Sequence, residues 1–308
     1  MHILDQLTSY SCEQVCKEDF RLKREQQGIR CKKCGSMEHY WLSGKWQWQC
    51  KKCRFRTTLK SGTIMEQSKM SLRKWYQVMI LMSATKKGIS AKEMQRQFGK
   101  ARYESTWNLM HKIRQAMGHR ENRYKLEDQI ELDEAYYRVE TLEEKKAGQK
   151  RGRGSVSTVP VSVMIESVRL EDIETNETTT RCGYLKMKLI EDHKAETIDE
   201  VVKENIEKSA ILFSDDSSSY THLDGIVEAH HATKSSNETT RTVLHWVHTA
   251  ISNSKRVFNG IHHKLNRKYI QNYLSEFCYK FNRRFFKDKL FGRVIIAVAT
   301  STVSIDFR

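Results

Sequence analysis

The sequence predicts a multidomain α+β protein in which a small cysteine-rich module, a helical segment and a larger α/β domain follow one another. Three observations support this prediction: two C-x2-C pairs near the N-terminus, a series of helix-period segments with capping signals, and a second half in which strand patterns surround a helix. We expect the three parts to span residues 1–60, 61–120 and 121–308. A chain of 308 residues with 38% hydrophobic residues can supply one large core and one or two small ones.

The charge of the chain limits the kinds of partner it can have. Lys and Arg number 54 against 38 Asp and Glu, so the formal net charge is +16. This surplus favours a polyphosphate partner such as nucleic acid, and a basic solvated surface without a partner is the alternative. The sequence has no run of about 18 apolar residues, and its first residues lack a basic start followed by an apolar core. We therefore expect a cytoplasmic protein that does not cross a membrane.

The N-terminal module is predicted to bind zinc. The stretch "CKKCGSMEHYWLSGKWQWQCKKC" places Cys31, Cys34, Cys50 and Cys53 as C-x2-C, fifteen residues, C-x2-C, which is the spacing of a structural zinc site. Each pair forms a tight knuckle, and two knuckles complete a tetrahedron of thiolates about 2.3 Å from the ion. The residues between the knuckles alternate as in a β-hairpin, so the module resembles a zinc ribbon. Its three tryptophans could stack on nucleic acid or form the small core of the ribbon.

The second part is predicted to be helical. Residues 71–88, 90–99 and 101–118 each have an apolar face at a helical period and end on glycine. Ser90, followed three residues later by Glu93, has the pattern of a capping box. Three short helices with tight turns resemble a helix-turn-helix element, although any three-helix packing element would share the pattern. On the third helix we expect Trp107, Met110 and Ile113 in the core, with these polar residues outside it: Arg102, Tyr103, Ser105, Thr106, Asn108, His111 and Lys112.

The third part begins with a strand whose two faces differ. Ile130 and Leu132 share one face, while Glu131, Asp133 and Ala135 share the other. Further strands are expected at 157–168, 182–190 and 209–216, and helices at 194–208, 245–256 and 273–286. The strand that ends at 216 carries an aspartate at its carboxyl end, where α/β sheets commonly hold their sites.

Two aspartates on neighbouring strands predict a metal site. Asp133 and Asp215 would lie on adjacent strands, and two buried carboxylates are tolerable when a divalent cation lies between them. The helix at 245–256 supplies His248, Ser252 and Lys255 at i, i+4 and i+7, hence on one face. His248 could complete the set of ligands and Lys255 could bind a DNA phosphate. A lone helix histidine is also commonly an ordinary surface or core residue, and this alternative stays open.

Four blocks of this sequence resemble those of a known enzyme family. They are "IELDEAYY", "ILFSDDSSSY", "HTAISNSKRVFNGIHH" and "KYIQNYLSEFCYKFNRRFF". In order and spacing they are similar to prokaryotic insertion-sequence transposases of the DDE class, in the ISXO2-like group with an N-terminal zinc ribbon and an RNase H-like catalytic domain. The resemblance extends from Cys31 to about Phe286.

The resemblance implies a role for each residue of the candidate site. Asp133 and Asp215 match the first two members of the catalytic triad, His248 the third, and Lys255 the basic residue seven positions later. Glutamate is usual at the third position, and branches of the group use asparagine or histidine. Histidine there favours Mn²⁺ or similar ions over Mg²⁺.

Other residues could replace those members of the triad. Asn253 is the alternative third ligand if the helix register differs. The adjacent Glu134 and Asp216 are the competing carboxylates.

The activity implied is that of a DNA transposase. It would bind the terminal inverted repeats of its insertion sequence and use Mg²⁺ or Mn²⁺, beside the structural Zn²⁺, for DNA strand cleavage and strand transfer. Its partners would be double-stranded DNA, both transposon ends and target, and pairing two ends requires a homodimer or higher homo-oligomer. A basic loop at 145–155 would follow the phosphates, and Arg283 and Arg284 would flank the site. Two alternatives are a zinc-ribbon DNA-binding regulator with an inactive nuclease-like domain, and an RNase H-like nuclease without joining activity.

Overall fold

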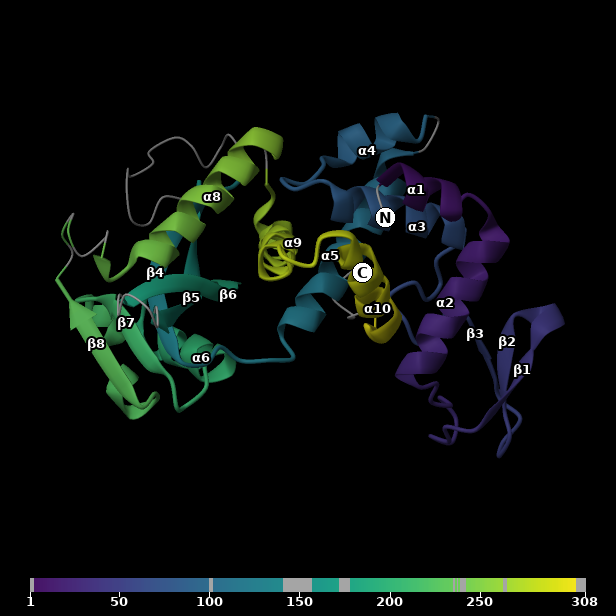
Figure 1. Cartoon of the computed structure of the whole chain (residues 1–308), viewed down its shortest axis with the longest axis horizontal. Helices are drawn as coiled ribbons and strands as arrows, with labels where there is room; N and C mark the ends of the chain where they lie inside the picture. The colour runs from purple at the N-terminus through teal and green to yellow at the C-terminus, as the bar shows by residue number, and fades with distance from the viewer. Residues whose placement is uncertain are drawn as a thin grey trace. The chain divides into compact units, whose positions relative to one another are not determined.

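The computed structural model of the chain describes residues 3–99, 102–140, 157–171, 178–234, 236, 238, 242–262 and 265–302. The chain divides into two compact units, and Figure 1 labels their elements. Unit 1 comprises Met1–Arg120 and Arg283–Arg308, and unit 2 comprises Glu121–Asn282. Within the described ranges, no helix combines the length and the apolar character needed to span a membrane.

Unit 1 combines the N-terminal sheet with helices from both ends of the chain. Its elements are α1 (Ile3–Ser9), α2 (Glu13–Gln27), β1 (His39–Leu42), β2 (Gln47–Cys50), β3 (Arg56–Thr58), α3 (Leu72–Ala84), α4 (Ala91–Gln97), α5 (Tyr103–Glu121) and α10 (Leu290–Thr300). The strands form an antiparallel sheet in the order β1-β2-β3. The hairpin predicted between the cysteine pairs is therefore present, with a third short strand added.

The C-terminal helix changes one expected boundary. α10 packs against α2 and α3, and it buries Phe291 and Val298. The ring centroid of Phe291 lies 5.3 Å from that of Tyr10 and 5.8 Å from that of Tyr76. Residues 283–308, which we expected in the catalytic domain, therefore group with the N-terminal unit, because this apolar helix finds its core there. The sequence analysis did not predict α10.

The tryptophans of the ribbon join it to α2. The ring centroid of Trp41 lies 5.7 Å from that of Trp46 and 5.0 Å from that of Trp48. Three cations of α2 lie over these rings: Lys17 over Trp46 at 5.6 Å, Arg21 over Trp41 at 5.1 Å and Arg24 over Trp48 at 5.1 Å. The rings are thus engaged within unit 1, which supports their interpretation as a core, one that the ribbon shares with α2.

The start of α3 is capped from two sides. Ser71 accepts the backbone N–H of Lys74 through Oγ at 3.2 Å. Glu13 of α2 accepts the N–H of Leu72 through Oε1 at 3.0 Å and that of Arg73 through Oε2 at 2.7 Å. These bonds satisfy three of the N–H groups that every helix start leaves without an intrahelical partner, and they fasten α3 to α2.

The helices of this segment differ from the expectation in their ends and in one face. α3 ends at Ala84 rather than Gly88, and α5 continues past Gly118 to Glu121. Thr106 and His111, expected on the polar face of α5, are fully buried, whereas Met110 and Ile113 are buried as predicted.

The capping box at α4 is half formed. Ser90 Oγ accepts the N–H of Glu93 at 3.1 Å, as the pattern predicts. The Glu93 carboxylate instead accepts two hydrogen bonds from Arg96, each 2.8 Å long. A charge-assisted pair with an arginine one turn on thus takes the place of the second half of the box.

Unit 2 is a five-stranded mixed sheet covered by helices. Its elements are β4 (Gln129–Arg138), β5 (Thr158–Glu171), β6 (Thr178–Leu189), α6 (Ala195–Asn205), β7 (Ile211–Asp215), β8 (Ala229–Thr233), α8 (His245–Ile261) and α9 (Ile270–Asn282). The strand order is β6-β5-β4-β7-β8, with β4, β5 and β6 antiparallel and β7 and β8 parallel to β4. This is the RNase H-like α/β domain that the sequence predicts.

Helices cover both faces of this sheet, as Figure 1 shows. Ala135 and Tyr137 of β4 pack with α8 and α9 in one core, and Ile130 and Leu132 pack with α6 in the other. The alternation predicted for β4 is therefore confirmed. The face predicted to be polar is nevertheless covered, so its carboxylates lie beneath helices instead of in open solvent.

Two elements of unit 2 depart from the expectation. The edge strand β8 was not predicted, because its residues "AHHAT" show no apolar alternation and are all partly or fully exposed. α9 begins at Ile270 and ends at Asn282 instead of running from 273 to 286. Its last residue is fastened to β6: Asn282 Oδ1 accepts the N–H of Leu185 at 2.7 Å, and Nδ2 donates to the Leu185 carbonyl at 2.9 Å.

Candidate active site and cysteine cluster

The four cysteines of unit 1 converge as the sequence predicts. Among the described residues, Cys31, Cys34, Cys50 and Cys53 form a group of potential metal ligands whose atoms all lie within 4.8 Å of one another. The Sγ atoms of Cys31 and Cys53 are 3.5 Å apart, as are those of Cys34 and Cys50. Sulfur atoms about 2.3 Å from a tetrahedral ion lie about 3.8 Å apart, so the cluster is compatible with a structural zinc.

Backbone N–H groups favour the thiolate form of Cys50. The N–H of Cys53 is the main cause that lowers the pKa of the Cys50 thiol to about 6. Because the thiolate is the form that binds metal, N–H groups that favour it also favour metal binding.

In unit 2, the two predicted aspartates lie on neighbouring strands. β4 and β7 pair in parallel with Ile130 opposite Leu212 and Glu131 opposite Phe213. The same offset of 82 residues places Asp133 opposite Asp215, two positions beyond the last of these pairs. Asp133 therefore shares the face of Glu131, which is the face covered by α8 and α9.

The two aspartates repel each other electrostatically. The pKa of Asp133 is raised to about 6, mainly by burial and also by the charge of Asp215, while the N–H of Glu134 and the charge of Lys255 oppose the rise. The Asp133 side chain is 17% exposed, so water screens this repulsion poorly. A divalent cation between the two carboxylates would relieve it.

Helix α8 brings His248 to Asp133. The Nδ1 atom of His248 lies 3.6 Å from Asp133 Oδ2. Burial lowers the pKa of His248, with Asp215 acting in the opposite direction and Lys255 in the same one. Burial therefore favours the neutral imidazole, which is the form that can ligate a metal.

The spacing of these atoms fits a common metal ion. Two ligand atoms about 2.1 Å from one ion lie about 3.0 Å apart at right angles and about 4.2 Å apart across it. The 3.6 Å between His248 Nδ1 and Asp133 Oδ2 falls within that range. Two carboxylates and one imidazole form a donor set suited to Mn²⁺ and related ions. The structure thus brings His248 within ligand distance of Asp133, and it places Asp215 on the strand that pairs with β4.

The competing residues have different surroundings from those of Asp133. Asn253 of α8 and Asp216 after β7 are exposed. Glu134 is on the α6 side of β4, where its charge raises the pKa of the buried Tyr220 phenol beyond the effect of burial.

Sequence reasoning missed one residue of this site. Glu131 was recognised only as a polar position beside Asp133, yet its Oε2 accepts the N–H of Trp246 at 2.7 Å and that of Val247 at 2.9 Å. It is 2% exposed, and burial raises its pKa to about 7 against the opposing effect of those N–H groups. The signal that could have identified Glu131 was a carboxylate in the middle of a strand that is buried on both faces. Such a carboxylate requires hydrogen-bond donors, which a neighbouring element must supply.

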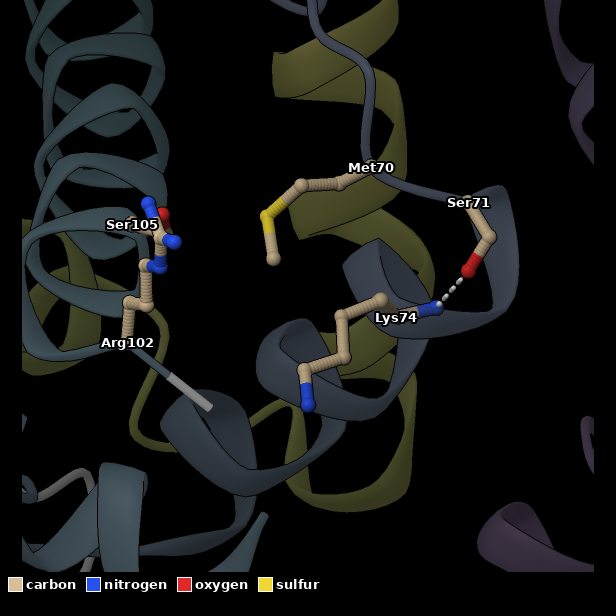
Figure 2. Close-up of a pocket in the computed structure, with 5 residues that line it drawn as sticks. All are labelled: Met70, Ser71, Lys74, Arg102 and Ser105. Atoms are coloured by element: carbon tan, nitrogen blue, oxygen red, sulfur yellow. Dashed lines mark hydrogen bonds between the residues drawn. The ribbon is translucent and has the colours of Figure 1, made fainter. Parts of the chain in front are cut away.

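Unit 1 contains an open pocket of about 360 Å³ at the starts of α3 and α5. Figure 2 shows Arg102 and Ser105 at the start of α5 on one side, Ser71 and Lys74 at the start of α3 on the other, and the Met70 side chain between them. Two cations and two hydroxyl groups make this pocket suitable for a phosphate group.

The positions of two further predicted DNA-binding features cannot be compared with this site. The basic loop at 145–155 lies outside the described residues. Arg283 and Arg284 follow α9 and belong to unit 1, whereas the aspartates belong to unit 2.

The comparison with known proteins agrees with the geometry of unit 2. Residues 125–282 match the family model of the ISXO2-like transposase domain. This match covers slightly more than half of the 308 residues and nearly all of unit 2. No curated protein matches the chain at a significant level. Because the family model covers the sheet, both aspartates and α8, the chain belongs to the ISXO2-like transposase family.

Proposed function

We propose that this transposase binds the terminal inverted repeats of its own insertion sequence and catalyses metal-dependent cleavage and strand transfer of DNA. The observation that carries the proposal is the 3.6 Å approach of His248 to Asp133 on the sheet face that also holds Asp215. Buried acidic groups that repel each other, with a neutral imidazole beside them, favour a divalent cation.

Each residue of the site has a proposed role. Asp133, Asp215 and His248 hold the catalytic Mg²⁺ or Mn²⁺, and Lys255 binds the phosphate beside the scissile bond. A divalent metal held there would supply Lewis-acid activation of water and of a 3′-hydroxyl, and charge stabilisation of the leaving oxygen. The partial burial of Asp133 keeps its charge poorly screened, which strengthens its hold on the cation.

Unit 1 is proposed to bind the DNA ends. The cysteine cluster holds a structural Zn²⁺ that closes the ribbon, and the pocket at α3 and α5 binds a backbone phosphate. The net charge of +16 supports a DNA partner. Two ends must be held together for transposition, so a homodimer or higher homo-oligomer forms on DNA.

Two other functions use the same features. A DNA-binding regulator with an inert nuclease-like domain would bind the ends without cutting, and the His248 substitution for the usual glutamate is the observation that favours it. A nuclease without joining activity would cut without producing joined strands. The site geometry favours the transposase, because a site that had lost its function would be under no constraint to keep His248 within ligand distance of Asp133.

The first test is DNA cleavage and joining by the purified full chain. Wild-type protein is expected to cut DNA that flanks its own gene and join it to a target plasmid, in Mn²⁺ and in Mg²⁺ measured separately. Asp215→Asn and His248→Ala each remove a proposed ligand and should lower the rate more than about 100-fold. Asp216→Asn is the matched control, because this exposed neighbour should be dispensable. Loss of activity in Asp216→Asn with retention in Asp215→Asn would contradict the assignment.

The second test concerns zinc. The wild-type chain is expected to contain one zinc ion, measured by atomic emission after dialysis, because four thiolates saturate a tetrahedral ion. Cys50→Ser removes one of them and should abolish zinc retention. Cys12→Ser, which replaces an exposed cysteine outside the cluster, should leave the zinc content unchanged. Full zinc content in the Cys50→Ser variant would exclude this site.

The third test concerns the phosphate pocket. Arg102→Ala should weaken binding to the terminal repeat and flatten the slope of log K against log salt by about 1, because one phosphate contact is lost. Lys203→Ala removes the same charge from an exposed position of α6 and should change neither quantity. Both quantities are measured by fluorescence anisotropy at several salt concentrations. Equal effects of the two variants would mean that Arg102 contributes only to the net charge and that the pocket does not bind a phosphate.

A further inference from the structure

We propose that Glu131 is a positioning residue: it fixes the first turn of α8 on β4 and so sets the place where His248 meets Asp133. This inference rests on the function proposed above, because it concerns the third ligand of the same site. Glu131 itself does not touch the candidate metal position in the proposal. It acts through the helix that carries His248.

The Glu131 side chain supplies the hydrogen-bond acceptor that the start of α8 needs. The first N–H groups of an α-helix have no intrahelical acceptor, and a side chain commonly supplies one. Leu244, which precedes α8, makes no side-chain cap. Glu131 Oε2 takes that place by accepting from Trp246 at 2.7 Å and Val247 at 2.9 Å, across more than 100 residues of sequence. The cap of α8 therefore comes from the strand that carries Asp133.

A second contact holds the middle of α8 to the same strand. The hydroxyls of Tyr137 and Ser254 lie 2.6 Å apart, and both residues are almost fully buried. Glu131 and Tyr137 lie on either side of Asp133 along one face of β4, while their partners lie on either side of His248 along α8. The two contacts thus enclose the pair that is proposed to bind metal.

This double attachment fixes the register of α8. A shift of one residue would move the helix about 1.5 Å along its axis and turn it by about 100°, which would remove His248 from Asp133. Such a shift would break both the Glu131 contact and the Tyr137 contact. The buried Glu131 carboxylate is costly unless its hydrogen bonds are made, so the fold strongly favours the register in which they form.

The test is the affinity of the zinc-loaded full chain for Mn²⁺, measured by electron paramagnetic resonance of the unbound ion. Glu131→Leu removes the acceptor and should raise the Kd for Mn²⁺ about 10- to 100-fold, as loss of a residue that orients a ligand does. Glu131→Gln retains an acceptor oxygen and should restore most of the affinity. Glu166→Leu is the matched control, because Glu166 also accepts two backbone N–H groups in unit 2, from Glu127 at 3.2 Å and Tyr184 at 2.7 Å, without contacting α8.

A double-mutant cycle separates positioning from general stability. In a His248→Ala background, Glu131→Leu should change the Kd for Mn²⁺ less than about twofold, because the group it positions is already absent. Equal weakening in both backgrounds would overturn the proposal, as would a folded Glu131→Leu variant with wild-type affinity. Should Glu131→Leu fail to fold, Tyr137→Phe removes the second attachment and should raise the Kd about threefold or more, and an unchanged Kd would overturn the proposal.

Failure of the proposed function has a different signature. A wild-type chain whose Mn²⁺ binding is unaffected by Asp215→Asn, and which does not cleave DNA, would refute the proposed function and this inference with it. If Asp215→Asn weakens Mn²⁺ binding but Glu131→Leu leaves the Kd for Mn²⁺ unchanged, this inference alone would be refuted.

Discussion

The repulsion between two partly buried carboxylates is the constraint on which the candidate site depends. Asp133 and Asp215 lie on two strands that pair in parallel, and the charge of Asp215 adds to burial in raising the pKa of Asp133. A fold gains nothing in stability from placing two acids in this way. Lys255 opposes the rise in the pKa of Asp133, and burial lowers the pKa of His248, which favours its neutral form. A divalent cation bound between the two aspartates during function, as we propose, would relieve their repulsion.

The cysteine cluster and the proposed metal site of unit 2 are built in different ways. The cysteine cluster is local in sequence and closed, with four thiolates on two knuckles of one small sheet. Soft thiolates and a complete shell suit a structural zinc. The site in unit 2 is assembled from two strands and a helix, with oxygen and nitrogen donors that favour harder ions and leave positions for substrate. Its geometry therefore depends on long-range contacts such as that between Glu131 and the start of α8.

Those differences explain what could be predicted from the sequence. The zinc spacing is visible in a short stretch, and the alternation around Asp133 predicts which residues share a face. Asp215 was found because it ends an apolar strand. Glu131 was not assigned a role, because period-2 alternation makes it look like a solvent-facing residue and does not reveal that α8 covers that face. The strand β8 and the placement of α10 were missed for the same reason: tertiary contacts, not local pattern, determine them.

The most direct measurement is anomalous scattering from Mn²⁺ bound in crystals of the full chain. The account predicts a peak between β4 and β7, within about 2.3 Å of a carboxylate oxygen of Asp133, a carboxylate oxygen of Asp215 and Nδ1 of His248. A peak held by Asp216 or Glu134, or one that takes Asn253 in place of His248, would contradict it.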